Sequence, residues 1–479
     1  MNTSKRVFDT DIQVLKYKVL KSIIQHFDAG TLHNAALDIP LQLSPGPKST
    51  MRCCIYKERA IVSERIRMAL GGNRSNPNPI EVLPIACDEC PLGGYTVSGA
   101  CRGCIAHRCQ HACPKDAIEF IDGHAHINKS KCVNCGRCAD ACPYTAIYKR
   151  IRPCENACKI HAIGVDEETG AARIDNQKCI SCGACVYQCP FGAIVDKSYL
   201  LDTLRLIKDS GCNERYKVYA IVAPAISSQF VGYARTPQII SGLQVLGFYS
   251  VVEAALGADM VAWEEAKELA EKKFLTSSCC PAFVRYVQTA FPQMAENISH
   301  NPSPMIAVAQ FIKRTDPTAK CVFIGPCTAK KREFLEDESH AIDSVLTFEE
   351  LQALFAARKI ELDQLPDGLL DNASYYGRIF ARSGGLSEAV AQSIKEQDLD
   401  FCAKPIVCDG IEQCRMALLK ANKNILPENF IEGMACVGGC IGGAACISHG
   451  PKDKGEVDKY GRESLEKTIS GAISVTKAL

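Results

Sequence analysis

The spacing of cysteines is the feature that most constrains this chain. Its 479 residues include 29 cysteines, and sixteen of these fall within residues 86–200. Secreted disulfide scaffolds are usually much shorter, and zinc sites usually pair two separate C-x2-C units. Runs of four closely spaced cysteines that end before proline are typical of iron–sulfur sites instead. Two runs have this spacing in full: Cys132-x2-Cys135-x2-Cys138-x3-Cys142-Pro143 and Cys179-x2-Cys182-x2-Cys185-x3-Cys189-Pro190.

These two runs match the pattern of bacterial ferredoxins. In that pattern, three thiolates bind one face of a 4Fe–4S cube, and the fourth cysteine reaches across to another cube. We therefore expect two cubes. The predicted ligands are Cys132, Cys135, Cys138 and Cys189 for the first cube, and Cys179, Cys182, Cys185 and Cys142 for the second.

Eight further cysteines in this region leave two interpretations open. Cys101-x2-Cys104-x4-Cys109-x3-Cys113 has the same pattern with a longer third gap. Cys154-x3-Cys158 is the tail of another unit, whose missing pair Cys87-x2-Cys90 can supply. Sixteen cysteines would then serve four cubes, and the pairing would change, because the first two units are spaced like the halves of one ferredoxin. In the alternative, Cys87, Cys90, Cys101 and Cys104 form a zinc site, or some of these cysteines bind no metal.

The net charge and the lengths of the apolar runs exclude some classes of partner and location. The net charge is +1, so nothing favours a nucleic acid or an anionic membrane as partner. No run of 18 apolar residues predicts a membrane span, and the first 30 residues lack the apolar core of a signal peptide. We therefore expect a cytoplasmic protein whose thiols stay reduced.

Residues 215–479 alternate apolar strand-like runs with helical stretches, a pattern that predicts an α/β fold with a largely parallel sheet. Open α/β sheets bind ligands beyond the carboxyl ends of their strands. Four cysteines follow such runs and are predicted to converge: Cys280, Cys327, Cys436 and Cys440. The predicted strands are 217–224, 272–278, 320–327, 404–410 and 430–436.

Three segments of this region resemble the signature segments of the FeFe-hydrogenases: TSSCCPAF (276–283), GPCTAKKRE (325–333) and EGMACVGGC (432–440). The resemblance implies a two-lobed α/β catalytic domain with mixed sheets flanked by helices, over residues 215–479. It also implies an H-cluster between the lobes, which is a 4Fe–4S cube joined to a two-iron subsite with CO, CN and azadithiolate ligands. An α+β ferredoxin-like domain (86–200, with its best motifs at 123–152 and 170–199) and a helical N-terminal segment (1–85) would precede it.

The resemblance also assigns roles to individual residues. Cys280, Cys327, Cys436 and Cys440 resemble the H-cluster ligands, and Cys440 resembles the one that bridges the cube and the two-iron subsite. Cys279 resembles the family's proton-transferring cysteine, with a predicted path of Cys279, Glu268, Ser299, Glu265 and solvent. Lys330 resembles the lysine that pairs with a cyanide ligand. The residues that resemble the lining of the subsite are Ala223, Pro224, Ala225, Ser303 and Met434.

The implied reaction is 2 H⁺ + 2 e⁻ ⇌ H2, with electrons exchanged with ferredoxin or a similar low-potential carrier. Hydrogenase maturation proteins are further implied partners, and a monomer is expected. Gly325 before Pro326, Met305 and Phe283 depart from the best-known members, so the chain resembles a divergent monomeric subgroup, the group B type. Two alternatives are a low-activity hydrogen or redox sensor of the same fold and a non-catalytic iron–sulfur electron carrier.

Overall fold

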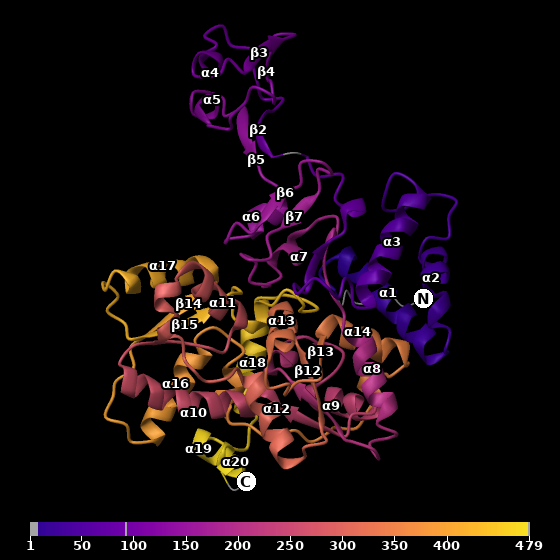
Figure 1. Cartoon of the computed structure of the whole chain (residues 1–479), viewed down its shortest axis with the longest axis vertical. Coiled ribbons are helices and arrows are strands. Elements are labelled where there is room, and N and C mark those ends of the chain that lie inside the picture. Colours follow the sequence, from indigo (N-terminus) through magenta and orange to yellow (C-terminus); the bar gives the residue numbers. More distant parts are fainter. Residues whose placement is uncertain (1–7, 92, 478–479) are drawn as a thin grey trace.

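The computed structural model describes residues 8–91 and 93–477. It forms an elongated molecule in which two small β-containing modules project from a larger α/β region (Figure 1). Helices from the start of the chain lie beside the inner module and the larger region. None of the helices in the described residues is long and apolar enough to cross a membrane.

The N-terminal segment is helical, as its apolar spacing predicts. Val19, Leu20, Ile23 and Ile24 recur on one face and are buried in the core that the segment shares with the α/β region. The helices are α1 (Asp11–Asp28), α2 (Ala35–Leu43) and α3 (Ile55–Ala69).

The outer module is inserted into the chain of the inner module. The inner strand β1 precedes the outer module in sequence, yet it pairs antiparallel with β8, which follows it. The outer module comprises β2 (Gly94–Val97), α4 (Arg108–His111), β3 (Ile118–Ile121), β4 (His124–Ile127), α5 (Arg137–Asp140) and β5 (Ile147–Arg150). The inner module comprises β1 (Ile80–Val82), α6 (Pro153–Ala157), β6 (Ile163–Val165), β7 (Ala172–Ile174), α7 (Ala184–Gln188) and β8 (Ile194–Asp196).

The α/β region contains two sheets whose named strands pair only in parallel among the described residues. The expected α/β fold with largely parallel sheets is confirmed, whereas the mixed pairing implied by the resemblance is not found among these named strands. Parallel neighbours need a crossover connection, and helices supply most of these crossovers. The first sheet has the order β10 (Ser250–Glu253), β9 (Val218–Val222), β12 (Lys320–Gly325) and β13 (Ser344–Thr347). The second has the order β11 (Leu275–Thr276), β15 (Phe430–Met434) and β14 (Pro405–Asp409).

Helices flank both sheets (Figure 1). The longest, α10, packs against α12 and α16. The helices of this region are α8 (Leu200–Asp209), α9 (Thr236–Val245), α10 (Ala254–Lys272), α11 (Pro281–Ala290), α12 (Pro304–Thr315), α13 (Thr328–Glu336), α14 (Phe348–Ala357), α15 (Tyr375–Ile379), α16 (Gly385–Glu396), α17 (Ile411–Asn422), α18 (Asp453–Arg462), α19 (Ile469–Ala472) and α20 (Ser474–Lys477).

Candidate active site and iron–sulfur relay

The sixteen relay cysteines gather into four groups of four, two in each module. In the outer module, each group of four cysteines lines its own small pocket. The outermost group is Cys101, Cys104, Cys109 and Cys142. The next group is Cys113, Cys132, Cys135 and Cys138.

The inner module holds the other two groups. Within each of them, burial raises the pKa of one thiol, and the charge of another thiol raises it further. Cys90 and Cys154 both interact with Cys87 and Cys189. Cys158 interacts with Cys179, Cys182 and Cys185. The third group is therefore Cys87, Cys90, Cys154 and Cys189, and the fourth is Cys158, Cys179, Cys182 and Cys185.

This grouping corrects the first pairing predicted from sequence. Cys189 does not join Cys132, Cys135 and Cys138, and Cys142 does not join the run that begins at Cys179, because the two complete runs lie in different modules (Figure 1). Instead, the fourth cysteine of each run joins three cysteines from the other half of its own module. The structure also separates Cys87 and Cys90 from Cys101 and Cys104, so these four cysteines do not form one site.

The backbone around these cysteines suits thiolate ligands. The last cysteine of three units accepts an N–H from an alanine four residues later, as Ala117 donates to Cys113 and Ala193 donates to Cys189. Ala162 donates to Cys158 in the same way. The alanine that recurs at this position in each repeat is buried in all four units, where its small side chain fits. In the described residues no three His, Cys, Asp or Glu side chains are placed to share one metal ion. A cube spreads its four ligands over four irons.

Four more cysteines meet at the strand ends of the α/β region. Cys280 begins α11 and Cys327 begins α13. Cys436 and Cys440 follow β15. Burial raises the pKa of both thiols, and the nearby charges of Cys327 and Cys280 raise it further. The predicted convergence of Cys280, Cys327, Cys436 and Cys440 is therefore present in the structure.

The fourth relay group lies against these four strand-end cysteines, the candidate catalytic set. Cys182 interacts with both Cys280 and Cys436. Thr328 donates a 2.7 Å hydrogen bond to the Ser181 carbonyl, and this contact docks α13 onto the loop that carries Cys182. Gly183 allows the approach, because a Cβ there would lie 2.5 Å from Thr328 Oγ1 and its φ is +79°. A pocket of about 760 Å³ is lined by cysteines of both sets.

Cys279 has different surroundings from its neighbour Cys280. Its side chain is buried in an apolar cluster with Met434, Leu275 and Phe380. Burial raises the pKa of the Cys279 thiol well above its usual value, and the nearby Glu265 raises it further. The thiol therefore keeps its proton at neutral pH.

The structure reverses the predicted order of the two glutamates. Glu265 is completely buried and lies beside Cys279, whereas Glu268, one turn later on α10, lies towards the surface. Ser299 Oγ donates a 2.8 Å hydrogen bond to Glu268 Oε2 and also lies near Glu265. The sequence of groups is therefore Cys279, Glu265, Ser299 and Glu268, because α10 runs outward from the strand ends.

The two carboxyl groups differ in protonation. Burial raises the pKa of Glu265 to about 8. Neither of its oxygens has a hydrogen-bond partner of normal length among the described residues, although Ser278 and Ser299 lie close enough to moderate the shift. Burial also opposes ionisation of Glu268. There, hydrogen bonds from Lys272, Ser299 and the His300 backbone outweigh burial and lower the pKa.

The remaining predicted lining residues lie at the same strand ends. Lys330 is buried, bonds Glu333 Oε2 at 2.6 Å and donates to the Cys279 carbonyl at 3.4 Å. The Ser303 hydroxyl is buried and has no hydrogen-bond partner among the described residues, so it is free to bind another group. The segment Ala223–Pro224–Ala225 follows β9, where the Ala223 N–H donates to the Ile324 carbonyl of β12.

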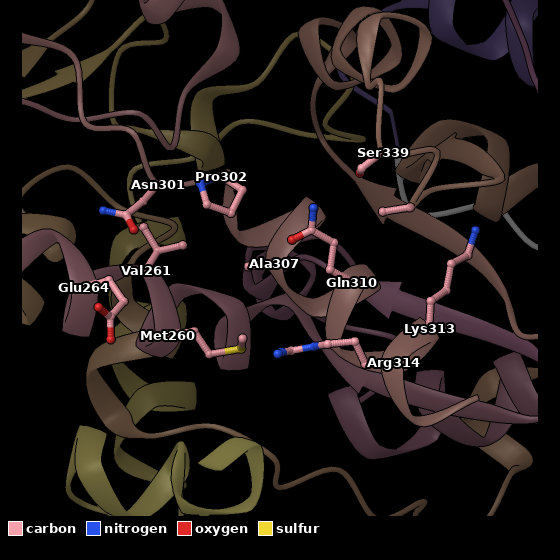
Figure 2. Close-up of a pocket in the computed structure, with 11 residues that line it drawn as sticks. Met260, Val261, Glu264, Asn301, Pro302, Ala307, Gln310, Lys313, Arg314 and Ser339 are labelled. Atoms are coloured by element: carbon pink, nitrogen blue, oxygen red, sulfur yellow. The ribbon is translucent and has the colours of Figure 1, made fainter. Parts of the chain in front are cut away.

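Several polar neighbours of this site were not predicted. Asn301 Nδ2 donates to Glu268 and to Ser299, at 3.1 and 3.0 Å. Asn301 also borders a pocket of about 490 Å³ between α10 and α12 (Figure 2). Lys272 and Glu333 stand one helical turn after Glu268 and Lys330, and this spacing is the signal that would have found them.

Comparison with known proteins places this arrangement in a family. The model of the iron only hydrogenase large subunit, C-terminal domain, matches residues 216–444, and the 4Fe–4S binding domain matches residues 125–148 and 172–195. Iron hydrogenase 1 of Clostridium pasteurianum is 30% identical over 406 residues, covering 72% of this chain and 69% of the relative. The chain belongs to the iron-only hydrogenase family. It is thus an FeFe-hydrogenase-type protein with ferredoxin-like modules, as its signature segments indicate.

The chain is also similar to a second curated hydrogenase and to a solved structure. The periplasmic [Fe] hydrogenase large subunit of Nitratidesulfovibrio vulgaris is 28% identical, with 68% of this chain and 86% of the relative covered. A solved structure of the [FeFe]-hydrogenase HydA1 from Chlamydomonas reinhardtii, variant E141A, aligns with a TM-score of 0.48 and 19% identity. That alignment covers 58% of this chain and 93% of the other.

The cofactors of this hydrogenase-family chain are 4Fe–4S clusters and an H-cluster. The donor set fits both. Four cysteine groups lie in the ferredoxin-like modules, and a fifth lies at the strand ends. Beside the fifth are the unpartnered Ser303 hydroxyl and the buried Lys330 ammonium, which suit the anionic ligands of a two-iron subsite.

Proposed function

We propose that this protein catalyses the reversible reaction 2 H⁺ + 2 e⁻ ⇌ H2. The observation that carries the proposal is the meeting of two routes at one place. The cysteine groups lead to Cys280 and Cys436, and a buried acid–base series leads to Cys279. The H-cluster supplies the site where protons and electrons combine or separate.

In this proposal the four strand-end cysteines hold the H-cluster. Cys280, Cys327 and Cys436 would bind its cube, and Cys440 would be the ligand that the cube shares with the two-iron subsite. Lys330 and Ser303 offer N–H and O–H donors to the ligands of the subsite. Donors fixed in a site that excludes water stabilise charge without reorganisation during the reaction.

Protons reach the site through side chains that are not metal ligands. During H2 production, Glu268 passes a proton to Ser299, Ser299 passes its own hydroxyl proton to Glu265, and Glu265 recharges the Cys279 thiol. H2 oxidation uses the same groups in reverse. Glu265 suits this task, because a proton-transfer group works best when its pKa lies near the working pH.

Electrons travel through the relay in a fixed order. The outermost cysteine group lies at the far end of the molecule, and the fourth group contacts the catalytic set (Figure 1). We propose that ferredoxin or a similar low-potential carrier exchanges electrons at the outer end. We further propose that maturation proteins insert the two-iron subsite, and that the chain acts as a monomer in the cytoplasm.

Gas turnover and infrared spectroscopy together test the proposal. The matured protein should produce H2 from reduced ferredoxin and consume H2 with an oxidised dye, and it should show infrared bands of iron-bound CO and CN⁻. Bands without turnover in either direction would contradict catalysis. Turnover too slow to support metabolism, combined with a hydrogen-dependent interaction with a partner, would indicate the sensor alternative.

A further inference from the structure

The proton path described above ends at a group that is itself mostly covered. The Glu268 side chain is only 13% exposed, so it needs a neighbour that exchanges protons with water. Two side chains contact its carboxylate from the solvent side: Lys272, on the same helix, and His300, in the segment after Ser299.

His300 is held against Glu268 by its backbone as well as by its ring. Its ring Nδ1 lies 2.9 Å from Glu268 Oε1, and its backbone N–H donates to both Glu268 oxygens, at 3.2 and 3.1 Å. The ring is nevertheless 76% exposed. One residue is therefore anchored at the inner group while its titratable ring stands in water.

Lys272 is less suited to exchange protons. Its ammonium lies 2.8 Å from Glu268 Oε1 and 3.0 Å from His300 Nδ1. A lysine ammonium beside a carboxylate keeps its proton at neutral pH, whereas histidine gains and loses a proton near pH 7. Lys272 therefore holds Glu268 in its charged form.

The other charged groups near His300 have bonding partners of their own. They line the same surface pocket of about 540 Å³. Glu336 Oε1 lies 2.8 Å from Arg332 and 3.5 Å from Arg285, and Glu333 bonds Lys330. Asp337 accepts hydrogen bonds from residues 339 and 341. Glu268 and Lys272 are then the charges in direct contact with the His300 ring.

We propose that His300 is the outer proton station of this protein, a positioning residue that loads and unloads Glu268. The inference rests on the hydrogenase function proposed above. During H2 production, a buffer acid protonates the ring, and the ring passes one proton to the Glu268 carboxylate. The exposed ring then turns to water for the next proton. Only N–H and O–H bonds form and break, and one proton moves inward per cycle.

The test compares His300 variants of the matured full-length protein in weakly buffered solution. We expect His300→Ala to lower H2 production from reduced methyl viologen roughly tenfold at neutral pH, less than the ~10²–10⁴-fold that a group at the reacting atoms contributes. Added imidazole should restore His300→Ala towards the wild-type rate. His300→Gln keeps a hydrogen-bonding side chain that does not take up or release a proton near neutral pH, so it should be slow as well.

The matched control is His33→Ala, which changes an exposed histidine of the N-terminal segment. It should match the wild type with and without imidazole. Equal rates for His300→Ala and the wild type, or a loss that imidazole does not relieve, would overturn the inference. A wild-type protein that makes no H2 although its CO and CN⁻ bands are present would overturn the proposed function as well.

Discussion

Cys279 and Cys280 are adjacent in the sequence but have different surroundings. Cys280 caps α11 next to the other three strand-end cysteines, whereas Cys279 is buried beside Glu265. A metal-bound thiolate is committed to its metal, while a thiol that keeps its proton can transfer it. We therefore propose that Cys280 serves electron transfer and Cys279 serves proton transfer.

Substitutions at this pair should have different signatures. Cys279→Ala should leave the infrared CO and CN⁻ bands in place and remove most turnover, because only the proton donor is lost. Cys280→Ala should weaken or abolish the bands, because a cube ligand is lost. Infrared spectra and H2 assays on both variants check this, and normal turnover in Cys279→Ala would contradict the proton role.

Glu265 should control the pH dependence of turnover. Its pKa is raised to about 8 by burial, so it is protonated at neutral pH and loses its proton as the pH rises through 8. We expect wild-type H2 production to fall across that range. Glu265→Gln should be slower by ~10²-fold or more and should lose this limb of the pH profile.

Glu268→Gln should also slow turnover, because the outer carboxylate can no longer carry a proton. Glu264→Gln is the matched control on the same helix. Its side chain bonds Lys267 at the surface and lines a different pocket (Figure 2). If Glu265→Gln and Glu268→Gln both turn over as fast as Glu264→Gln and the wild type, with clusters assembled in each, the path is refuted.

At the scale of elements, the sequence predicts strand ends better than strand partners. The five expected strands are present as β9, β11, β12, β14 and β15. Four of them correspond to apolar runs that end at glycine, proline or cysteine, whereas β11 is only the two residues Leu275–Thr276. The short strands β10 and β13 were missed, since four residues that lead directly into a helix carry little period-2 pattern.

The relay shows the same limit. Local spacing identifies each cysteine turn, but the choice of partner depends on which halves share a module. The outer module interrupts the inner one between Cys90 and Cys154, so the first half of the inner module is split in the sequence. The order of Glu265 and Glu268 along the proton path could likewise not be predicted from sequence. Residues three apart share a helix face whichever end of the helix lies nearer to the site.

A buried charge cluster joins three parts of the chain. Lys331 of α13 bonds Asp196 of the inner module at 2.8 Å and Glu350 of α14 at 3.0 Å. Lys16 of α1 bonds the same Asp196 at 2.5 Å. Burial alone would raise the pKa of Asp196, but the two lysines outweigh it and hold the pKa below its usual range.

Breaking this cluster should destabilise the joined parts. Lys331→Met leaves buried carboxylates without their partner, and we expect a loss of about 3–5 kcal/mol in the free energy of unfolding. Anaerobic denaturant titration measures it, with Arg205→Met, which breaks an exposed pair with Asp202, as the control. Because the pKa of Asp196 is lowered, this stabilisation is present above about pH 4 and is lost as the pH falls further.

At the scale of the whole molecule, the four relay groups form a route from a projecting tip to the catalytic set (Figure 1). The loop around the outermost group carries Arg102 and Arg108, both exposed, and Ile105, which is 98% exposed. These residues suit an acidic electron carrier with an apolar contact near its own cluster.

Charge reversal at the tip should separate docking from chemistry. Arg102→Glu with Arg108→Glu should raise KM for reduced ferredoxin by roughly tenfold or more at low salt, an effect that salt weakens. Turnover with methyl viologen, a small cationic dye, should not fall. Lys115→Glu with Lys131→Glu is the charge-matched control on the same module. Equal KM values for all three proteins would place the docking site elsewhere.

The grouping of the sixteen relay cysteines also predicts the metal content. Four cubes and an H-cluster contain about 22 irons per chain, whereas two cubes and an H-cluster contain about 14. Iron and protein quantitation of the matured protein should give the higher value. A value near 14 would show that two of the four cysteine groups hold no cube.

The most direct test of hydrogen chemistry is isotope exchange, which needs no external electron carrier. The matured protein should form HD from D2 in H2O, because D2 is split at the site and its deuterons exchange with water through Cys279 and the buried acid–base series. The Cys279→Ala variant with intact CO and CN⁻ bands should form HD far more slowly. A wild-type protein with these bands that forms no HD would contradict the account.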